Sequence, residues 1–193
     1  MNDRQEPDVW HHGLVTRYWA EFETEGGEAA EYFQRLIETS GEPALDIGCG
    51  SGRLLLPFLQ AGLDVDGCDI SSDMVTHCRE RVEPEGFSPH LYGQGVHELD
   101  LPRRYRTMIA CGVIGLGGER ALTADGMRRC YEHLRPGGVF TFDFAPRYND
   151  PPPWLSRLPE HRHRLPDAWP VSGERVTLPD GDELELLVRT VSV

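Results

Sequence analysis

Residues 46–53 have the residue types and the spacing of a ligand-binding turn. The run reads Asp46-Ile47-Gly48-Cys49-Gly50-Ser51-Gly52-Arg53. The dinucleotide fingerprint G-x-G-x-x-G places its glycines on a strand-to-helix turn that holds a pyrophosphate. Gly48 and Gly50 match its first two positions, but Arg53 stands where the third glycine belongs. The observed D-x-G-x-G-x-G spacing therefore disfavours a pyrophosphate ligand.

An acid on each side of the glycines suits a ligand that carries an amino acid and a ribose. The glycines let the backbone approach such a ligand without a Cβ clash. Asp46 can accept hydrogen bonds from an amino group, and Asp69, 17 residues after Gly52, can accept them from both ribose hydroxyls. S-adenosylmethionine has both parts and no pyrophosphate. We therefore predict that it binds here, with its adenine ring between Ile70 and Met74.

Three stretches of the chain, taken in order, resemble class I S-adenosylmethionine-dependent methyltransferases. They are residues 44–53 (ALDIGCGSGR), 67–74 (GCDISSDM) and 134–138 (LRPGG), and the resemblance covers about residues 8–145. The chain looks most like the branch that methylates small molecules. The resemblance implies S-adenosyl-L-methionine as the cofactor, a seven-stranded sheet, and the cofactor contacts given above for Asp46, the glycines and Asp69.

The resemblance also implies an aromatic N-terminal helix that folds over the cofactor. On that basis Tyr18 and Trp19 would cap the methionine end, and Arg17 would reach the methionine carboxylate. The alternative for the two aromatic side chains is ordinary packing in the core.

The adenine end departs from the family pattern. Many members have an Asp after the third strand, and aligning residues 98–102 with the family puts Gly95 at that position. Gln94 is then expected to substitute through its side-chain carbonyl, and Val96 to give a backbone contact to the ring. The other residues expected beside the cofactor are small, with the two cysteines interpreted as packing residues: Cys49, Ser51 and Cys111.

The expected reaction is an in-line displacement at the methyl carbon of a sulfonium, with an N or O atom of a small molecule as the acceptor. Because the leaving thioether is neutral, alignment and the exclusion of water supply much of the catalysis. A base is needed only if the acceptor must lose a proton. The candidate bases are Tyr18, His11 and His12, whereas the apolar loop 112–118 offers none. We expect no single indispensable catalytic residue.

Two other functions remain open from the sequence. One is a non-catalytic S-adenosylmethionine-binding protein or a degenerate scaffold subunit, and the other is a dehydrogenase. The pairs His11-His12 and His161-x-His163 lack a third ligand at a suggestive spacing, so no metal is expected.

Composition excludes several kinds of chemistry. The 193 residues include 19 basic side chains, all of them Arg, and 32 acidic ones, for a net charge of −13. The absence of Lys rules out a Schiff-base lysine and a phosphate-loop lysine, and the acidic balance disfavours a nucleic-acid partner. Five cysteines without C-x-x-C spacing indicate free thiols in a reducing cytoplasm. No apolar run approaches the roughly 20 residues that span a membrane.

Alternating apolar runs predict the elements that position these residues. Strands are expected at 44–47, 65–69, 89–92, 107–111 and 139–144, and helices at 8–22, 28–38, 53–60, 72–82 and 123–134. Such alternation predicts an α/β fold, a Rossmann-like, doubly wound, mostly parallel sheet with helices on both faces. Its ligands bind beyond the carboxyl ends of the strands. Ser71 or Ser72 would cap the helix at 72–82, and residues 135–138 would end the helix at 123–134.

The pattern changes after residue 145. We expect residues 1–145 to form the cofactor-binding domain with its helical cap. Residues 146–193 are expected to form a proline-rich excursion and an antiparallel hairpin, with strands at 175–178 and 183–188 around Asp180-Gly181. The family core needs two further strands after the fifth. The seven-stranded core is therefore expected to be incomplete, and the hairpin to belong to a substrate-side insertion in a truncated chain.

Overall fold

The computed structural model describes residues 12–22, 25–113, 124–143, 172–177, 181 and 183–188. Two compact units divide the chain, Met1–Tyr148 and Asn149–Val193. The boundary expected from the sequence lies three residues earlier, and the assignment of the two parts as functional domains stays a prediction.

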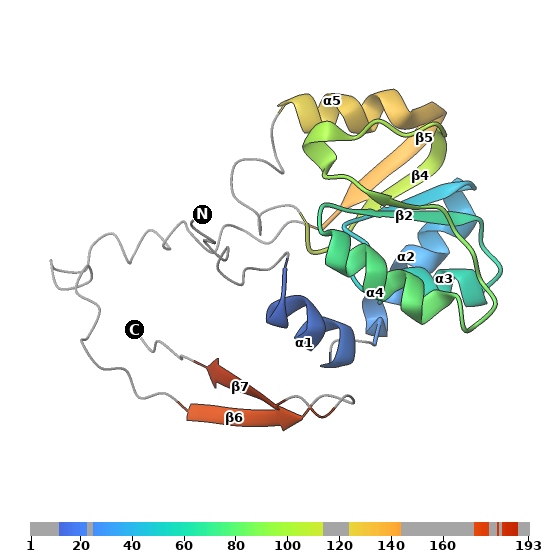
Figure 1. Ribbon diagram of the computed structural model, residues 1–193. Helices are drawn as coiled ribbons and strands as arrows, with labels where there is room; N and C mark the ends of the chain where they lie inside the picture. Colours follow the sequence, from blue (N-terminus) through green and yellow to red (C-terminus); the bar gives the residue numbers. More distant parts are fainter. Residues whose placement is uncertain are drawn as a thin grey trace, which may run out of the picture. The chain divides into compact units, whose positions relative to one another are not determined.

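A parallel sheet of five strands forms the first unit (Figure 1). In chain order the strands are β1 (Ala44–Ile47), β2 (Val65–Asp69), β3 (Leu91–Gly93), β4 (Tyr105–Ala110) and β5 (Leu134–Phe142). Their order in the sheet is β3-β2-β1-β4-β5, and every neighbouring pair is parallel. The chain order reverses at β1, which pairs with β2 on one side and β4 on the other. Ligands of open parallel sheets bind at such a point.

Helices cover both faces of this sheet, which confirms the predicted fold class. The helices are α1 (Leu14–Phe22), α2 (Gly27–Ser40), α3 (Leu55–Gln60), α4 (Ser72–Val82), the short 3₁₀ helix η1 (Val96–Glu98) and α5 (Ala124–His133). Figure 1 shows α2, α3 and α4 on one side of the sheet and α5 on the other. Successive strand side chains alternate between these sides: Ala44 packs with Ile37 and Phe58, and Leu45 packs in the cluster that holds Cys130.

The expected bounds of three strands are wrong. The third strand lies at 91–93 rather than 89–92, and the fourth at 105–110 rather than 107–111. The fifth begins at Leu134, directly after α5, so residues 135–138 lie inside β5 and not in a turn that ends the helix.

An irregularity in β5 explains the last correction. Tyr105 pairs with Leu134 but Thr107 pairs with Val139, so extra residues of β5 bulge out between the two pairs. Gly137 has a positive φ of 72° there, and the Arg106 Nη1 donates to the Pro136 carbonyl at 2.9 Å. The proline-glycine run thus forms a bulge that β4 holds in place.

The second unit contains the expected antiparallel hairpin. Its strands are β6 (Ser172–Thr177) and β7 (Glu183–Val188), with Ser172 opposite Val188 and Thr177 opposite Glu183. Gly181, in the connection, has a φ of 91°, which suits the Asp-Gly turn signal. The described residues of the first unit hold five strands of the seven that the family resemblance implies.

Candidate functional site

The glycine turn follows the carboxyl end of β1 and wraps the end of β2. Gly48 and Cys49 both donate their backbone N–H to the Cys68 carbonyl, at 2.7 and 3.0 Å. All three loop glycines have positive φ, at 69°, 54° and 88° for positions 48, 50 and 52. Side chains rarely adopt this region of backbone conformation, so glycine is required at each position by the turn itself.

Only one of these glycines leaves open space for a ligand. A Cβ on Gly48 would overlap the Val113 side chain, and a Cβ on Gly52 would lie 3.0 Å from the Cys78 sulfur. A Cβ on Gly50 would meet no atom within 4 Å. Gly48 and Gly52 thus make room for the protein's own packing, and Gly50 borders open space. The contact of the three glycines with a cofactor stays a prediction.

Asp69 connects this turn to the next strand. Its Oδ2 accepts the Gly50 N–H at 2.9 Å, and its Oδ1 accepts the Ser71 N–H at 2.8 Å. Each carboxylate oxygen has more than one acceptor site, so these bonds orient the group and leave it able to accept from a ligand. Ser71 then caps α4, with its Oγ accepting the Met74 N–H at 3.1 Å. This identifies Ser71 rather than Ser72 as the cap.

Asp46 is the most unusual group of the site. It is 2% exposed, and its Oδ2 has no hydrogen-bond partner. Burial raises the pKa of its carboxyl from 3.8 to about 7, while Arg53 lowers this pKa and Asp69 raises it. Buried polar atoms almost always have partners. An orphaned carboxylate oxygen at the carboxyl end of β1, just before the glycine turn, fits the binding of a cationic group, as an amino-acid ligand would supply.

Arg53 and Asp143 both lie against the sulfur of Cys111, the residue that follows β4. The Arg53 guanidinium contacts the Gly26 carbonyl at 3.5 Å and the Cys111 sulfur at 3.9 Å. Asp143, which follows β5, accepts the Gly112 N–H at 2.7 Å, and its second oxygen lies 3.8 Å from the same sulfur. The carboxyl ends of β2, β1 and β5 thus each carry an acid: Asp69, Asp46 and Asp143.

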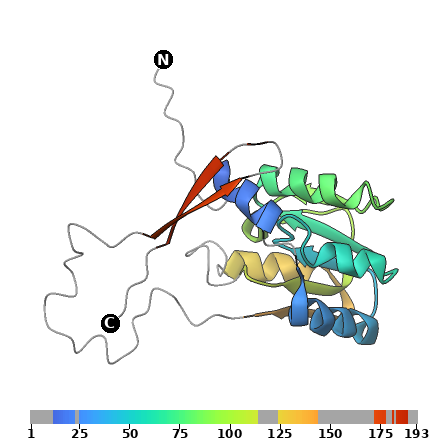
Figure 2. The same cartoon turned by 90° about the horizontal axis from the view of Figure 1, so that it is seen from below.

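Helix α1 lies against α4, next to these strand ends (Figures 1 and 2). The Gly13 N–H, just before α1, donates to Asp73 in the first turn of α4 at 3.1 Å. Tyr18 and Trp19 are half-buried, with ring centres 6.3 Å apart, and Tyr18 also packs on Phe22 at 5.1 Å. The contact of the two aromatic rings and Arg17 with a cofactor stays a prediction.

Known proteins place this arrangement in a family. Residues 44–138 match the family model of a methyltransferase domain. The ubiquinone biosynthesis O-methyltransferase of Nitrobacter winogradskyi is 31% identical over 100 residues, which are 52% of this chain and 37% of that protein. Residues 44–138 of this chain thus form a methyltransferase domain of the class I S-adenosylmethionine-dependent kind. The matches span only 37% to 42% of the length of the first curated relatives.

Solved structures of methyltransferases share the fold. The sugar N-methyltransferase KedS8 from Streptoalloteichus sp. superposes with a TM-score of 0.62 at 18% identity, over 97% of this chain and 71% of that chain. The glycopeptide N-methyltransferase MtfA in complex with S-adenosylmethionine superposes with a TM-score of 0.50 at 23% identity, over 88% of this chain and 68% of that chain. The predicted family and its cofactor, S-adenosylmethionine, are confirmed.

On the adenine side of the site, the Gln94 side chain already has a hydrogen-bond partner within the protein. Ile70, 42% exposed, lies beside Gly95, where an added Cβ would be 3.2 Å from the Ile70 side chain. The Gln94 carbonyl oxygen, expected to meet the adenine amino group, accepts the Asp100 N–H at 2.9 Å. Val96 is buried in the core. The contacts of Met74, Gln94, Gly95 and Val96 with adenine stay predictions, and that of Gln94 requires a second lone pair on its oxygen.

The cysteines near the methyltransferase site pack as expected. Cys49 is buried with its sulfur against Gly67, and burial together with neighbouring Cys78 raises the pKa of its thiol. Burial also raises the pKa of the Cys111 thiol. Ser51 is buried. Thiols with raised pKa are poor nucleophiles, which supports the interpretation of the two cysteines as packing residues. The contact of the three residues with a cofactor stays a prediction.

Sequence reasoning missed two groups. Asp143 was assigned only to the fifth strand, although an acid directly after a parallel strand lies on the ligand edge. His97 was not considered, although its ring lies 2.8 Å from the Cβ position of Gly95. Of the candidate bases, His12 is exposed at the start of α1, and His11 lies outside the described residues. The loop segment 114–118 also lies outside them.

The side chains of the described residues contain no group of three or more His, Cys, Asp or Glu placed to hold a metal ion. None of the described helices is long and apolar enough to cross a membrane.

Proposed function

We propose that this chain transfers the methyl group of S-adenosylmethionine to an N or O atom of a small molecule. The observation that carries the proposal is the buried Asp46 oxygen that has no hydrogen-bond partner, at the carboxyl end of the strand that the glycine turn follows. S-adenosylmethionine supplies an electrophilic methyl group on a sulfonium, which leaves a neutral thioether. The acceptor atom is not defined by the relatives, which include an O-methyltransferase and a sugar N-methyltransferase.

In this proposal, the position of each acid along the strand ends determines which part of the cofactor or acceptor it binds. Asp46 binds the amino group and Asp69 the ribose hydroxyls. The cofactor's methionine end is then directed toward β4, where Cys111 and Asp143 stand. Asp143 is exposed, and its Oδ2 lies 3.8 Å from the Cys111 sulfur and keeps further acceptor sites, so it can accept a hydrogen bond from the acceptor's N–H or O–H group. Alignment of this kind supplies most of the catalysis of such a reaction.

A set of further assignments belongs to the proposal. The acceptor is a small metabolite, the partner is not nucleic acid, and the protein works in the cytoplasm, because the net charge of −13 disfavours polyanions and the cysteines are free. The hairpin β6–β7 is proposed to belong to the acceptor side of the full active site.

A turnover assay tests the proposal against a non-catalytic S-adenosylmethionine-binding scaffold. The full chain is incubated with methyl-labelled S-adenosylmethionine and a panel of matched amine and hydroxyl metabolites, and mass spectrometry follows both the methylated product and S-adenosylhomocysteine. Acceptor-dependent formation of both products supports the enzyme. Binding of the cofactor without any turnover over the panel favours the scaffold, and tight binding of a nicotinamide dinucleotide would revive the dehydrogenase.

A further inference from the structure

Asp46 must be ionised to bind an amino group with full strength, and its surroundings oppose ionisation. The side chain is 2% exposed, with one oxygen unpartnered. Asp69 approaches from β2 with a second negative charge. Among the described residues, the other titratable groups that face it are thiols: Cys68 on β2, Cys49 on the turn and Cys111 after β4, with Asp143 behind Cys111. None of these can neutralise a carboxylate.

Arg53 is placed to oppose this repulsion. It directly follows the glycine turn and bridges two elements, through the Gly26 carbonyl before α2 and the Cys111 sulfur after β4. Strand β4 pairs with β1 in register, with Ile109 opposite Asp46 and Ala110 opposite Ile47. The guanidinium therefore lies at the carboxyl end of β1, where Asp46 is buried. Both of these contacts are long and weak, and neither partner is a carboxylate.

We infer that Arg53 is a positioning residue that favours the ionised form of Asp46 in the empty site, which makes binding of the methyl donor depend on pH near neutrality. The inference rests on the proposed cofactor role of Asp46. The electrostatics support it, since the Arg53 charge lowers the pKa of Asp46 against the larger effect of burial. With the pKa of Asp46 at about 7, small changes in the field move a large fraction of the protein between the two charge states.

The direct test is a titration of the empty protein. Carbon NMR of Asp side chains follows the Asp46 carboxyl, which is assigned with Asp46→Asn. We expect a midpoint near neutrality in the wild type and one higher by about one pH unit in Arg53→Met, which removes the charge at similar volume. Arg53→Lys keeps the charge and should restore the midpoint. Arg35→Met removes an exposed charge on α2, paired only with Glu31, and should leave it unchanged.

A binding measurement adds a readout that a merely structural role would not move. S-adenosylhomocysteine is the probe, because it carries the same amino group and does not react. From the ionised fractions, Arg53→Met should bind about fivefold more weakly than wild type at about pH 7 and within about 1.5-fold at about pH 8.5. Equal weakening at both pH values would overturn the inference, because it would indicate a direct contact or a structural fault.

The two experiments separate this inference from the proposed function. An unchanged Asp46 midpoint in Arg53→Met, or a midpoint below about pH 5 in the wild type, overturns the inference whether or not the cofactor binds. Failure of S-adenosylhomocysteine to bind the wild type at any pH overturns the proposed function, and the titration of the empty protein still decides the role of Arg53.

Discussion

At the scale of single residues, the Asp46 carboxylate is expected to favour binding of the cofactor and to lower the stability of the empty protein. Asp46 is buried with an unpartnered oxygen, and burial raises the pKa of its carboxyl to about 7. Its folded-state pKa thus lies above 3.8, the ordinary value for an Asp carboxyl in water. Between those two values the folded state binds a proton that the unfolded state has released, so this group makes the fold less stable as pH rises from about 4 to about 7.

Asp46→Asn should therefore stabilise the empty protein while it weakens cofactor binding. The free energy of unfolding at about pH 8 should rise by about 1–3 kcal/mol, and the gain should vanish at about pH 4. Urea denaturation at the two pH values measures both. A variant less stable than wild type at the higher pH would show that the carboxylate is satisfied in the empty protein.

The glycines of the turn should respond differently to alanine. Gly50→Ala meets no protein atom, so it should cost only the roughly 1–2 kcal/mol of a positive φ and yet weaken binding of S-adenosylmethionine. Gly48→Ala overlaps Val113 as well and should cost more stability. Denaturation and calorimetry on both variants make the comparison. Equal stability losses would mean that the open face of Gly50 is filled by protein.

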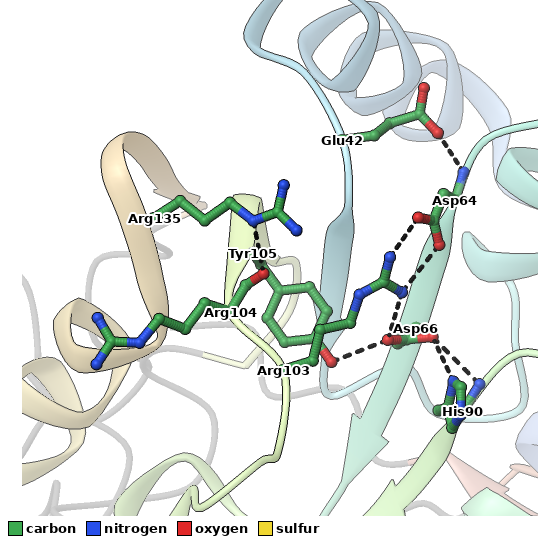
Figure 3. A network of polar contacts seen from close by, with 8 residues as sticks. All are labelled: Glu42, Asp64, Asp66, His90, Arg103, Arg104, Tyr105 and Arg135. Atoms are coloured by element: carbon green, nitrogen blue, oxygen red, sulfur yellow. Dashed lines mark hydrogen bonds and ion pairs between the residues drawn. The ribbon is translucent and has the colours of Figure 1, made fainter.

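At the scale of elements, a polar network ties β2 to β4 at their amino ends (Figure 3). Asp66, with a side chain 3% exposed, accepts from the Tyr105 hydroxyl at 2.9 Å and from Arg103 at 3.1 Å. Arg103 also binds Asp64, and the His90 N–H donates to Asp66 at 3.2 Å. Since Asp66 is the second residue of β2 and Asp69 is the last, this network stabilises the sheet away from the cofactor edge.

Tyr105→Phe should separate stability from binding. Loss of the buried hydroxyl removes one donor to Asp66 and should lower the free energy of unfolding by about 1–3 kcal/mol, with the affinity for S-adenosylmethionine unchanged. Tyr131→Phe, at a side chain 77% exposed, is the matched control and should change neither. A loss of cofactor affinity in Tyr105→Phe would show that the two ends of the strands are coupled.

The elements show why part of this structure could be predicted from sequence. Strands β1 and β2 and helix α4 were predicted at their observed bounds. Marked residues delimit two of them, because Gly48 follows β1 and the capping Ser71 precedes α4. The bulge in β5 was missed because Pro136 and Gly137 signal a turn, and only the contact with Arg106 on the neighbouring strand shows otherwise. The Gln94–Asp100 bond was missed for the same reason, since it depends on a loop that folds back on itself.

At the scale of the whole molecule, the cofactor edge belongs to the first unit alone. Residues 46–53 and 69–74 and helix α1 all lie within Met1–Tyr148. Ligand binding stabilises only the state that binds. S-adenosylmethionine should therefore slow amide hydrogen exchange in these three segments and leave β6 and β7 unprotected until an acceptor is added. Protection of the hairpin by the cofactor alone would place it in the cofactor site and contradict its proposed acceptor-side role.

The most direct test of the central claim is a calorimetric titration of the full chain with S-adenosylmethionine at about pH 8, where Asp46 is mostly ionised. We predict one-site binding with a dissociation constant in the micromolar range, about −8 kcal/mol, weakened about 10-fold or more in Asp46→Asn. Asp125→Asn, an exposed acid on α5, should bind like wild type. Absence of binding, or equal binding by Asp46→Asn, would contradict the account.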